Sequence, residues 1–308
     1  MTNMFGNESP KYVVLISAAA SPAASSLVRH LKSLGYYVIG LDSNEDAVAL
    51  GEYVCDEFYV SPKATDESYI PYIRELLSKI DVFVPFIDEE LEILHRLDSN
   101  DEIRKKTMLC PSPGALICLD KKLFQDYCES KGLSIAPVAE QAPAVFKPVK
   151  GRGGKGIIFA SDDDMYNRLN GVKGYLAQAL LQGEEYTVDC LYSHSGILKY
   201  AVPRKRLLAS GVSTIGQVHN NPAVLSLVEK VSERFDFTGL VNIQVMMVCN
   251  RAYLIEINPR ISGSIIFSIR SGADLVDIAL RDFLGLKGPK SVAIKEKTYI
   301  RYWEEYEV

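Results

Sequence analysis

A chain of 308 residues with 47% hydrophobic and 24% charged residues has the composition of a folded globular protein, and its length predicts two domains or one domain with a large lobe. The formal net charge is -5 and no basic stripe is present, so nucleic acid is not expected as a partner. No apolar run approaches the length of a membrane span, and the polar N-terminus lacks the apolar core of a signal peptide. The six cysteines and four histidines are scattered without zinc spacing, which predicts reduced thiols and a cytoplasmic protein.

The first predicted elements are a buried strand and a helix. "YVVLISAA" (12–19) is a continuous apolar run, typical of a parallel strand that is covered on both faces. The next segment has apolar residues at helical spacing. Ser21 is suited to cap this helix, Pro22 suits its first turn, and Gly35 marks its end.

The same alternation continues through the first third of the chain. "YYVIGLD" (36–42) is the second strand, and it completes a βαβ unit, which implies a right-handed crossover in a parallel sheet. A further strand, a helix and the strand "DVFVPF" (81–86) follow. We therefore expect residues 1–108 to form a doubly wound α/β domain with a parallel sheet.

The pattern changes from residue 109. Pro111, Pro113 and Gly114 indicate a linker, and two short helices follow it. Beyond these come strands joined by glycine turns, an amphipathic helix, a hairpin of two apolar strands turning at Asn250–Arg251, and a late helix. Residues 109–308 are therefore predicted to form a largely antiparallel α+β domain, with a small lid lobe at about 137–181.

The strand "YLIEINPR" (253–260) ends in polar residues. Because side chains alternate along a strand, Glu256 and Asn258 should face one way, and Ile255 and Ile257 the other. The two oxygen-bearing side chains could share a Mg²⁺ ion with Gln244 of the partner strand, and Arg260 has the forked donors that suit a phosphate or carboxylate. An edge strand with a polar, partly exposed end explains this stretch equally well.

The segment "FKPVKGRGGKG" (146–156) joins two strands through glycines. Lys147 stands in an otherwise apolar strand, where an unpaired lysine is costly, so a phosphate partner is expected. The glycines formally match G-x-G-x-x-G, but a strand follows where a dinucleotide site needs a helix, and Ile157 excludes a Walker A loop. A glycine hairpin can still fold over phosphates; a flexible basic turn is the alternative.

Two more elements carry charged residues near apolar segments. Lys121 precedes a helix and could reach a second phosphate, although alone it has the character of a surface lysine. Glu184 and Glu185 follow the apolar run "AQALL", which suits an adenosine site. Glu185 could accept hydrogen bonds from ribose hydroxyls, whereas Glu184 is expected to be solvated.

In this order, the four elements resemble the ATP-grasp superfamily, over roughly residues 110–285, with "IEINPRISGS" as the most specific piece. The N-terminal unit resembles the domain that precedes ATP-grasp in these enzymes. The resemblance is strongest to a single ATP-grasp unit of the carbamoyl-phosphate synthase large subunit and to stand-alone carboxylate–amine ligases.

The resemblance implies a role for each candidate residue, with ATP and Mg²⁺ (or Mn²⁺) as cofactors. Lys121 and Lys147 would hold the α- and β-phosphates under Gly153 and Gly154, while Gln178 would approach the adenine amino group, Leu181 would give backbone contacts and Glu185 would bind ribose. The metal would be ligated by Gln244, Glu256 and Asn258. Arg260 would act catalytically on the γ-phosphate, and Arg204, with Arg206, would bring positive charge toward the substrate or phosphates.

The implied function is an ATP- and Mg-dependent ligase that phosphorylates a carboxylate to an acyl phosphate and joins it to an amine or similar nucleophile. The partners would be small-molecule carboxylate and amine substrates, and a homodimer is one option for the assembly. A single ATP-grasp unit is not expected to run the whole carbamoyl-phosphate synthase reaction. The alternatives are phosphorylation of bicarbonate or carbamate in the manner of that synthase, and a non-catalytic nucleotide-binding protein.

A dinucleotide-dependent oxidoreductase is the rival of a different class. Asp42 ends the second strand, where a ribose-binding acid would lie. However, the loop "SAAASPAASS" after the first strand has none of the glycines that a pyrophosphate requires. A substrate-side platform is the better reading of this domain. The acidic turn with Asp88 and Glu90 agrees with a platform, and equally with simple negative charge at a helix N-terminus.

Overall fold

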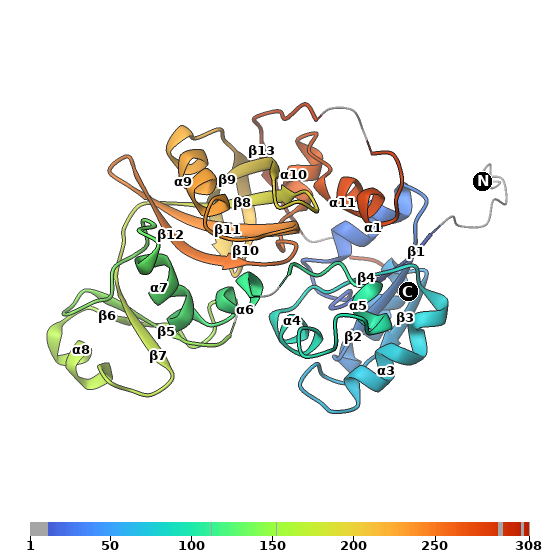
Figure 1. The fold of residues 1–308 in the computed structure, drawn as a ribbon, viewed down its shortest axis with the longest axis horizontal. Helices are drawn as coiled ribbons and strands as arrows, with labels where there is room; N and C mark the ends of the chain where they lie inside the picture. Colours follow the sequence, from blue (N-terminus) through green and yellow to red (C-terminus); the bar gives the residue numbers. More distant parts are fainter. Residues whose placement is uncertain (1–11, 112, 152, 289–291, 303–304, 308) are drawn as a thin grey trace. The chain divides into compact units, whose positions relative to one another are not determined.

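The computed structural model describes residues 12–111, 113–151, 153–288, 292–302 and 305–307. The chain divides into two compact units, one formed mainly by the residues up to Met108 and the other mainly by Leu109–Asp282. Each unit has its own sheets and is described by itself below (Figure 1).

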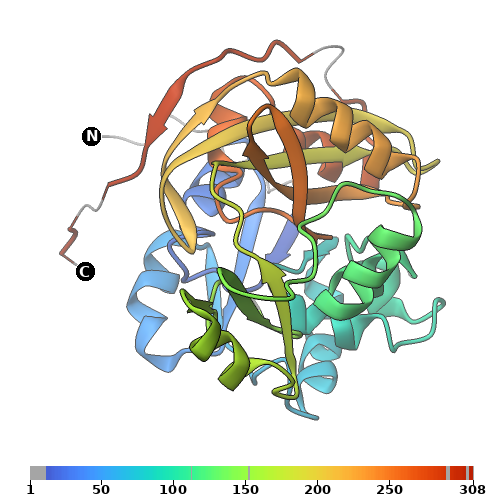
Figure 2. The ribbon, with the colours of Figure 1, turned by 90° about the vertical axis from the view of Figure 1, so that its left-hand side faces the viewer.

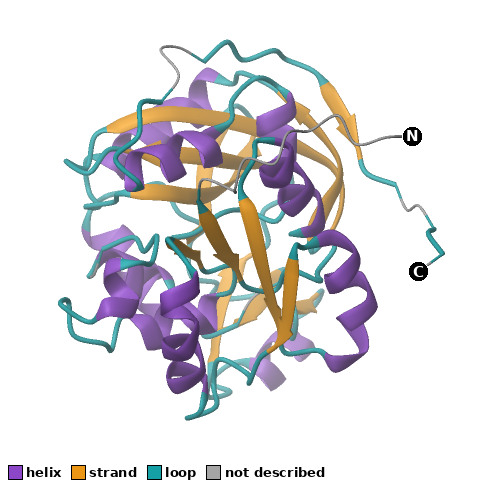
Figure 3. Ribbon diagram, turned by 90° about the vertical axis from the view of Figure 1, so that its right-hand side faces the viewer, coloured by secondary structure: helices purple, strands orange, loops and turns teal. Residues whose placement is uncertain are grey.

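The first unit contains a four-stranded sheet in the order β3-β2-β1-β4, and every neighbouring pair is parallel. Helices flank this sheet (Figure 3), so the predicted doubly wound α/β arrangement is confirmed. The strands are β1 (Val13–Ile16), β2 (Tyr37–Asp42), β3 (Glu57–Val60) and β4 (Val82–Val84), and the helices are α1 (Ser25–Ser33), η1 (Glu45–Ala47), α2 (Val48–Val54), α3 (Tyr69–Leu76), η2 (Leu77–Lys79), α4 (Asp88–Leu94) and α5 (Glu102–Lys105).

Helix α1 begins later than its sequence predicts. The segment from Ser21 to Ala24 forms a turn, and the regular helix starts at Ser25. Ser21 still acts as a cap for this turn, since its Oγ accepts a hydrogen bond from the backbone N–H of Ala24 at 3.3 Å. The difference lies in the entry to the helix and leaves the βαβ unit intact.

Glu90 is a buried structural carboxylate of the first unit. Its carboxylate accepts hydrogen bonds from Ser17 Oγ and Tyr69 Oη, both at 2.5 Å, and from the backbone N–H of Phe86 at 3.1 Å. Burial raises the pKa of Glu90, and these hydrogen bonds oppose the shift. Glu90 therefore joins the end of β1 to α3 and to the start of α4, which accounts for an acid at this helix terminus.

The second unit has an antiparallel six-stranded sheet in the order β12-β11-β8-β9-β10-β13 and a smaller three-stranded sheet in the order β6-β5-β7 (Figure 2). The strands are β5 (Ala144–Pro148), β6 (Ile158–Ala160), β7 (Tyr175–Ala179), β8 (Glu184–Tyr192), β9 (Leu198–Ser210), β10 (Val212–Val218), β11 (Gly239–Val248), β12 (Arg251–Asn258) and β13 (Thr298–Ile300), and the helices are α6 (Gly114–Cys118), α7 (Lys121–Ser130), α8 (Asp163–Leu169), α9 (Pro222–Ser232), α10 (Ile266–Arg270) and α11 (Leu275–Phe283).

The two faces of the six-stranded sheet differ in polarity. On β8, Tyr186, Val188 and Cys190 are buried in a core that includes residues of α6, α7 and α9. The intervening residues Thr187 and Asp189 point to the opposite face, as alternation along a strand requires. This second face carries polar side chains from β8, β9, β11 and β12, and most of the predicted site residues of the large sheet are among them.

The hairpin of β11 and β12 contains a bulge that the sequence did not reveal. Gln244 pairs with Glu256 and Val245 pairs with Leu254, so Ile255 is the extra residue. The buried apolar residues are Leu254 and Ile257, whereas Ile255 is half-buried, so the simple alternation expected for Ile255 and Ile257 is interrupted at the bulge. The turn also falls one residue earlier than predicted, at Cys249 and Asn250, which both have positive φ.

Candidate active site

The glycine segment between β5 and β6 forms a turn with unusual backbone angles. Gly151, Gly153, Gly154 and Gly156 all have positive φ, from 68° to 122°, a region that side chains with a Cβ rarely enter. Arg152, between the first two, lies outside the described residues. Such a backbone allows N–H groups to point together toward one anion, which is the property that a phosphate-covering loop needs.

Lys121 lies next to this segment at the start of α7. Its backbone N–H donates to Val149 O at 2.9 Å, and its Nζ donates to Gly151 O at 2.7 Å. Asp120 caps the helix by accepting hydrogen bonds from the N–H groups of Lys122 and Leu123. The ammonium of Lys121 is thus held beside the first glycine of the turn.

Lys147 is within electrostatic range of three other predicted site residues. It lies half-buried on β5. Burial is the largest influence on the pKa of its ammonium and lowers it. The negative charges of Glu256 and Glu185 oppose this shift, and the positive charge of Lys121 adds to it. Electrostatic effects of this kind require proximity, so the structure brings together four charged residues from β5, β8, β12 and the start of α7.

The metal candidates occupy one face of the β11–β12 hairpin. Gln244 lies directly opposite Glu256 in the pairing register, so their side chains share a face. Asn258 Nδ2 donates to Glu256 Oε1 at 3.2 Å, and Asn258 Oδ1 accepts a hydrogen bond from Arg260 Nη2 at 3.2 Å. Glu256, Asn258 and Arg260 therefore form a chain of direct contacts at the end of β12.

The donor set of this hairpin fits a hard divalent cation. One carboxylate and two amide oxygens are ligands that Mg²⁺ accepts, with the remaining positions filled by water and phosphate oxygens. As the amide of Asn258 is oriented here, its nitrogen faces Glu256. A half-turn of this amide would direct Oδ1 toward an ion shared with Glu256. Among the described residues, no group of three or more His, Cys, Asp or Glu side chains is arranged to bind a metal.

The two acidic residues at the start of β8 each contact a base on β9. Glu185 forms an ion pair with Arg206, and Glu184 with Lys205 at 2.5 Å. Arg206 also donates to Gly211 O at 2.8 Å, at the tip of the β9–β10 hairpin. The carboxylate expected to bind ribose is thus half-buried and already engaged, whereas Glu184 is mostly exposed, as predicted.

Gln178, the candidate for the adenine contact, lies buried on β7. Its Nε2 donates to Gln125 Oε1 at 2.7 Å, and Gln125 Nε2 in turn donates to Glu129 Oε1 at 2.7 Å and to Ala136 O at 3.1 Å. This chain of amides fixes the orientation of Gln178 and leaves its Oε1 buried without a hydrogen-bond partner. An unsatisfied buried acceptor is suited to a donor such as an exocyclic amino group.

Leu181 lies half-buried in the short connection between β7 and β8. The next residues bring the chain close to the large sheet at Gly183. A Cβ built on Gly183 would lie 1.9 Å from Met247 O, so only glycine allows this approach. The glycine of the G-x-E pattern thus places Glu185 on the polar face of the sheet.

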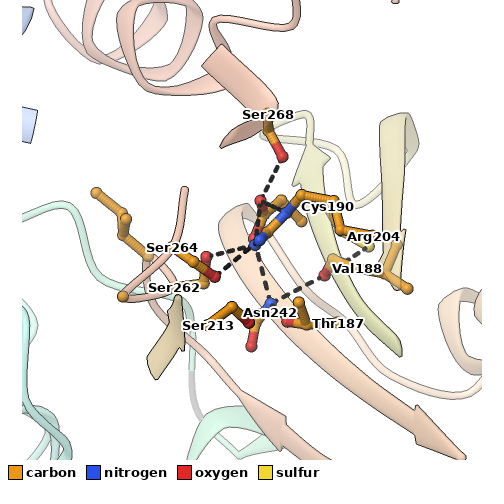
Figure 4. Close-up of polar contacts among 12 residues, drawn as sticks. Thr187, Val188, Cys190, Arg204, Ser213, Asn242, Ser262, Ser264 and Ser268 are labelled. Atoms are coloured by element: carbon orange, nitrogen blue, oxygen red, sulfur yellow. Dashed lines mark hydrogen bonds and ion pairs between the residues drawn. The ribbon is translucent and has the colours of Figure 1, made fainter. Parts of the chain in front are cut away.

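Arg204 differs from the other candidates because its guanidinium is fully buried. It forms an ion pair with Asp189 at 2.8 Å and donates to the hydroxyls of Ser262 and Ser264 at 3.0 and 2.7 Å (Figure 4). Asp189 also accepts hydrogen bonds from Ser268 and Asn242. The hydrogen bonds from Nε, Nη1 and Nη2 of Arg204 are thus all directed at protein groups.

Several residues of this polar face were not identified from the sequence. Thr187, Asp189 and Asn242 are buried on the central strands β8 and β11 and contact one another or Arg204. A signal was present, because polar residues at every second position of otherwise apolar strands indicate a polar sheet face. What the sequence could not give is the register that pairs Asn242 with Asp189.

A glycine turn and two lysines beside one sheet, with acidic and amide side chains on the face of another, fit the ATP-grasp fold that the sequence resembles. Comparison with known proteins agrees. Residues 172–306 match the family model described as ATP-grasp in the biosynthetic pathway with Ter operon, and residues 14–107 match the PylC-like N-terminal domain. The chain therefore has a PylC-like N-terminal domain followed by an ATP-grasp domain, and the resemblance seen in the sequence is confirmed.

The curated relatives are large chains of carbamoyl phosphate synthase. The chain is 25% identical to that of Clostridium perfringens (strain 13 / Type A) over 298 residues, which covers 86% of this chain and 27% of the relative. It is 23% identical to that of Agathobacter rectalis over 198 residues, covering 54% of this chain and 18% of the relative. The chain thus spans about a quarter or less of the length of these two relatives.

Solved structures show the same fold. N5-carboxyaminoimidazole synthetase from Staphylococcus aureus complexed with ADP superimposes with a TM-score of 0.74 at 18% identity, covering 97% of this chain and 84% of that chain. L-amino acid ligase from Bacillus licheniformis has a TM-score of 0.67 at 14% identity, covering 90% and 75%. In the described part of this chain, none of the helices has the length and apolarity needed to cross a bilayer.

Proposed function

We propose that the chain is an ATP- and Mg-dependent ligase that phosphorylates a substrate carboxylate and joins the resulting acyl phosphate to an amine or similar nucleophile. The observation that carries this proposal is the pairing of a carboxylate with amides on one hairpin, Glu256 with Gln244 and Asn258, within electrostatic range of the half-buried ammonium of Lys147. A protein that only binds a nucleotide needs cations for the phosphates. Here a carboxylate and amides lie near those cations as well, and they suit the metal ion that phosphoryl transfer requires. The names of the solved neighbours, a synthetase and a ligase, support the same class.

In the proposed mechanism, the protein supplies position and countercharge. Lys121 and Lys147 bind the α- and β-phosphates, and the N–H groups of Gly153 and Gly154 cover them. Glu185 accepts from the ribose hydroxyls. Bound at Gln244, Glu256 and Asn258, Mg²⁺ would neutralise phosphate oxygens.

Arg260 contacts the γ-phosphoryl group during transfer. The bond between this group and ADP breaks as a carboxylate oxygen of the substrate bonds to phosphorus, giving an acyl phosphate. The amine nitrogen then attacks the acyl carbon, phosphate leaves, and the nitrogen loses a proton. The forked donors of Arg260 suit the migrating oxygens better than a point charge does.

The adenine would lie against β7 and the connection to β8. Gln178 Oε1 accepts from the amino group, and the backbone of Leu181 contacts the base. The buried, unpartnered state of Gln178 Oε1 supports this role. A base without that amino group would leave the acceptor unsatisfied, so ATP should bind more tightly than GTP.

The domain limits and the cellular setting are also proposals. We take residues 1–108 as the N-terminal domain, residues 109–308 as the ATP-grasp domain and residues at about 137–181 as its lid lobe. The separate sheet of β5, β6 and β7 supports the lid. Small-molecule substrates and a cytoplasmic setting follow from the same function, and five of the six free cysteines are buried thiols, which suits a reducing compartment.

A second candidate has a specific basis in the carbamoyl phosphate synthase relatives. Here bicarbonate or carbamate would be the carboxylate that is phosphorylated, by the same residues. A single panel separates the candidates. ADP release would be measured with ATP·Mg²⁺, a set of carboxylates that includes amino acids and bicarbonate, and amines that include ammonia.

We expect one carboxylate to raise ADP release well above the rate with ATP alone, and Lys147→Met to abolish the increase. Stimulation by bicarbonate alone would select the second candidate. If ATP·Mg²⁺ binds but no carboxylate raises the rate, the chain is a nucleotide-binding protein without ligase activity.

A further inference from the structure

The connection between β12 and α10 is held by two arginines from other parts of the second unit. This connection comprises residues 259–265 and carries Arg260. Arg204 of β9 contacts the hydroxyls of Ser262 and Ser264, and Arg301, which follows β13, donates to Gly263 O at 3.2 Å. Three consecutive residues, 262–264, are therefore bound by guanidinium groups.

The arrangement around Arg204 is buried and nearly complete in its hydrogen bonds. Arg204 is 1% exposed and Asp189 is 2% exposed, so the ion pair is shielded from water. Asp189 is fixed in turn by Ser268 Oγ at 2.5 Å and by Asn242 Nδ2 at 3.2 Å. Breaking such a pair would leave a buried charge without its partner, which is strongly unfavourable. The ion pair therefore holds Arg204 and Asp189 in place.

The aromatic ring of Phe267 lies close to both arginines. The guanidinium carbons of Arg204 and Arg301 are 6.0 and 5.8 Å from its centroid. A Cβ on Gly216 would lie 3.0 Å from this ring, so glycine at that position lets Phe267 pack closely on β10. The start of α10 is thereby fixed on the sheet, beside the serines.

Arg260 lies between two fixed points. Asn258, two residues before it, belongs to β12 and accepts a hydrogen bond from its side chain at 3.2 Å. Ser262, two residues after it, is held by Arg204. Anchors this close on both sides leave the backbone of Arg260 little freedom, and a displacement of about 1 Å in a catalytic group costs on the order of 10²-fold in rate.

We propose that Arg204, fixed by Asp189, is a positioning residue that clamps Ser262 and Ser264 and thereby holds Arg260 in place for phosphoryl transfer. The inference rests on the proposed function, and it replaces the direct action of Arg204 on phosphates expected from the resemblance. The guanidinium fork reaches Asp189 and both serines at once, which the single nitrogen of lysine cannot do in the same geometry.

The test removes the hydrogen bonds between Arg204 and the connection, and leaves the ion pair of Arg204 with Asp189 intact. Ser262→Ala combined with Ser264→Ala removes both hydroxyls that Arg204 contacts on the connection. Ser193→Ala combined with Ser195→Ala is the matched control, because these two hydroxyls have the same spacing along the chain and contact each other at 2.9 Å instead of Arg204. ATP·Mg²⁺ affinity, hydrogen exchange of residues 259–265 and ADP release with the accepted carboxylate would be measured for each.

We expect the double variant to bind ATP·Mg²⁺ within about 3-fold of the parent and to exchange at least ~10-fold faster at 259–265. Its kcat should fall by about 10²-fold. The control should match the parent in all three measurements. Arg204→Lys should behave like the double variant, with a normal affinity for ATP·Mg²⁺.

Unchanged exchange at 259–265 in the double variant would overturn the clamp, and so would a parental kcat. In Arg204→Lys, lost ATP·Mg²⁺ affinity together with unchanged exchange at 259–265 would instead place Arg204 in direct contact with the nucleotide. If the parent binds ATP·Mg²⁺ but turns over no carboxylate, the ligase proposal fails, while exchange and affinity still decide whether the clamp exists.

Discussion

At the scale of single residues, the polar end of β12 is explained by its neighbours. Glu256 lies opposite Gln244, contacts Asn258 and influences Lys147. A partly exposed strand end, the plain alternative, would not require a half-buried lysine from another sheet beside it. The carboxylate is therefore best understood as part of a charged site.

Glu256→Gln tests this reading directly. The substitution keeps the shape and removes the charge, so the fold should remain intact because Glu256 is half-buried on the polar face. ADP release should fall by about 10²-fold or more, since charge stabilisation by a metal is worth several kcal/mol. Melting curves and turnover would be compared with those of Glu184→Gln. Because the side chain of Glu184 is exposed, this substitution should change neither the melting temperature nor the turnover. A parental rate in Glu256→Gln would exclude Glu256 as a metal ligand.

The protonation of Lys147 makes a second prediction. Burial lowers its pKa below the ordinary value of about 10.4. The triphosphate needs the charged form, so ATP affinity should decline with rising pH earlier than for an exposed lysine, and ATP binding near that pKa should take up a proton. Calorimetry in buffers of different ionisation enthalpy measures this uptake. Arginine at position 147 stays charged at these pH values, so Lys147→Arg should not take up this proton. Proton uptake equal to the parent's would mean that a group other than Lys147 titrates.

At the scale of elements, local signals predicted the strands well and their pairing poorly. Lys147 and Glu256 were found because a charge in an apolar run is visible in the sequence itself. The bulge at Ile255 and the pairing of Asp189 with Arg204 depend on the register between strands that are distant in sequence, which no local pattern contains.

Short or weakly patterned elements also escaped sequence analysis. Strand β10 carries serine, threonine and glycine, so its pattern is too polar to stand out, and helices α8 and α10 are only 7 and 5 residues long. These elements form because they pack on neighbours: β10 pairs with β9 and β13, and α10 places Phe267 on Gly216. Tertiary context, which a single sequence does not show, decides them.

The connection between the two sheets of the second unit depends on Gly183. Gly183→Ala would place a Cβ 1.9 Å from the backbone oxygen of Met247, so β8 or β11 must shift. We expect a loss of about 1–3 kcal/mol in the free energy of unfolding, by the cost of overpacking, together with weaker ATP binding because Glu185 moves. Denaturant titrations would measure the loss. Gly288→Ala, with no atom within 4 Å of its Cβ, is the control, and equal stabilities of the two variants would contradict this account.

At the scale of the whole molecule, the fold supports ATP as the nucleotide rather than NAD⁺ or NADP⁺. The first unit has a parallel sheet, but its described loop after β1, residues 17–24, contains no glycine to approach a pyrophosphate, while the second unit has the glycine turn and lysines. ATP·Mg²⁺ at 100 times its Kd should stabilise the protein by about 2.7 kcal/mol through mass action. Thermal shift assays with the three nucleotides test this, and a larger shift with a dinucleotide would refute the ATP site.

The central claim is that the γ-phosphoryl group of ATP passes to a carboxylate oxygen. Its most direct measurement supplies the accepted carboxylate labelled with ¹⁸O, together with ATP·Mg²⁺ and the amine, and analyses the products by mass spectrometry. We predict ADP and inorganic phosphate that carries one ¹⁸O atom from the carboxylate, because the acyl phosphate releases that oxygen when the amine attacks. Unlabelled phosphate, or AMP and pyrophosphate in place of ADP and phosphate, would contradict it.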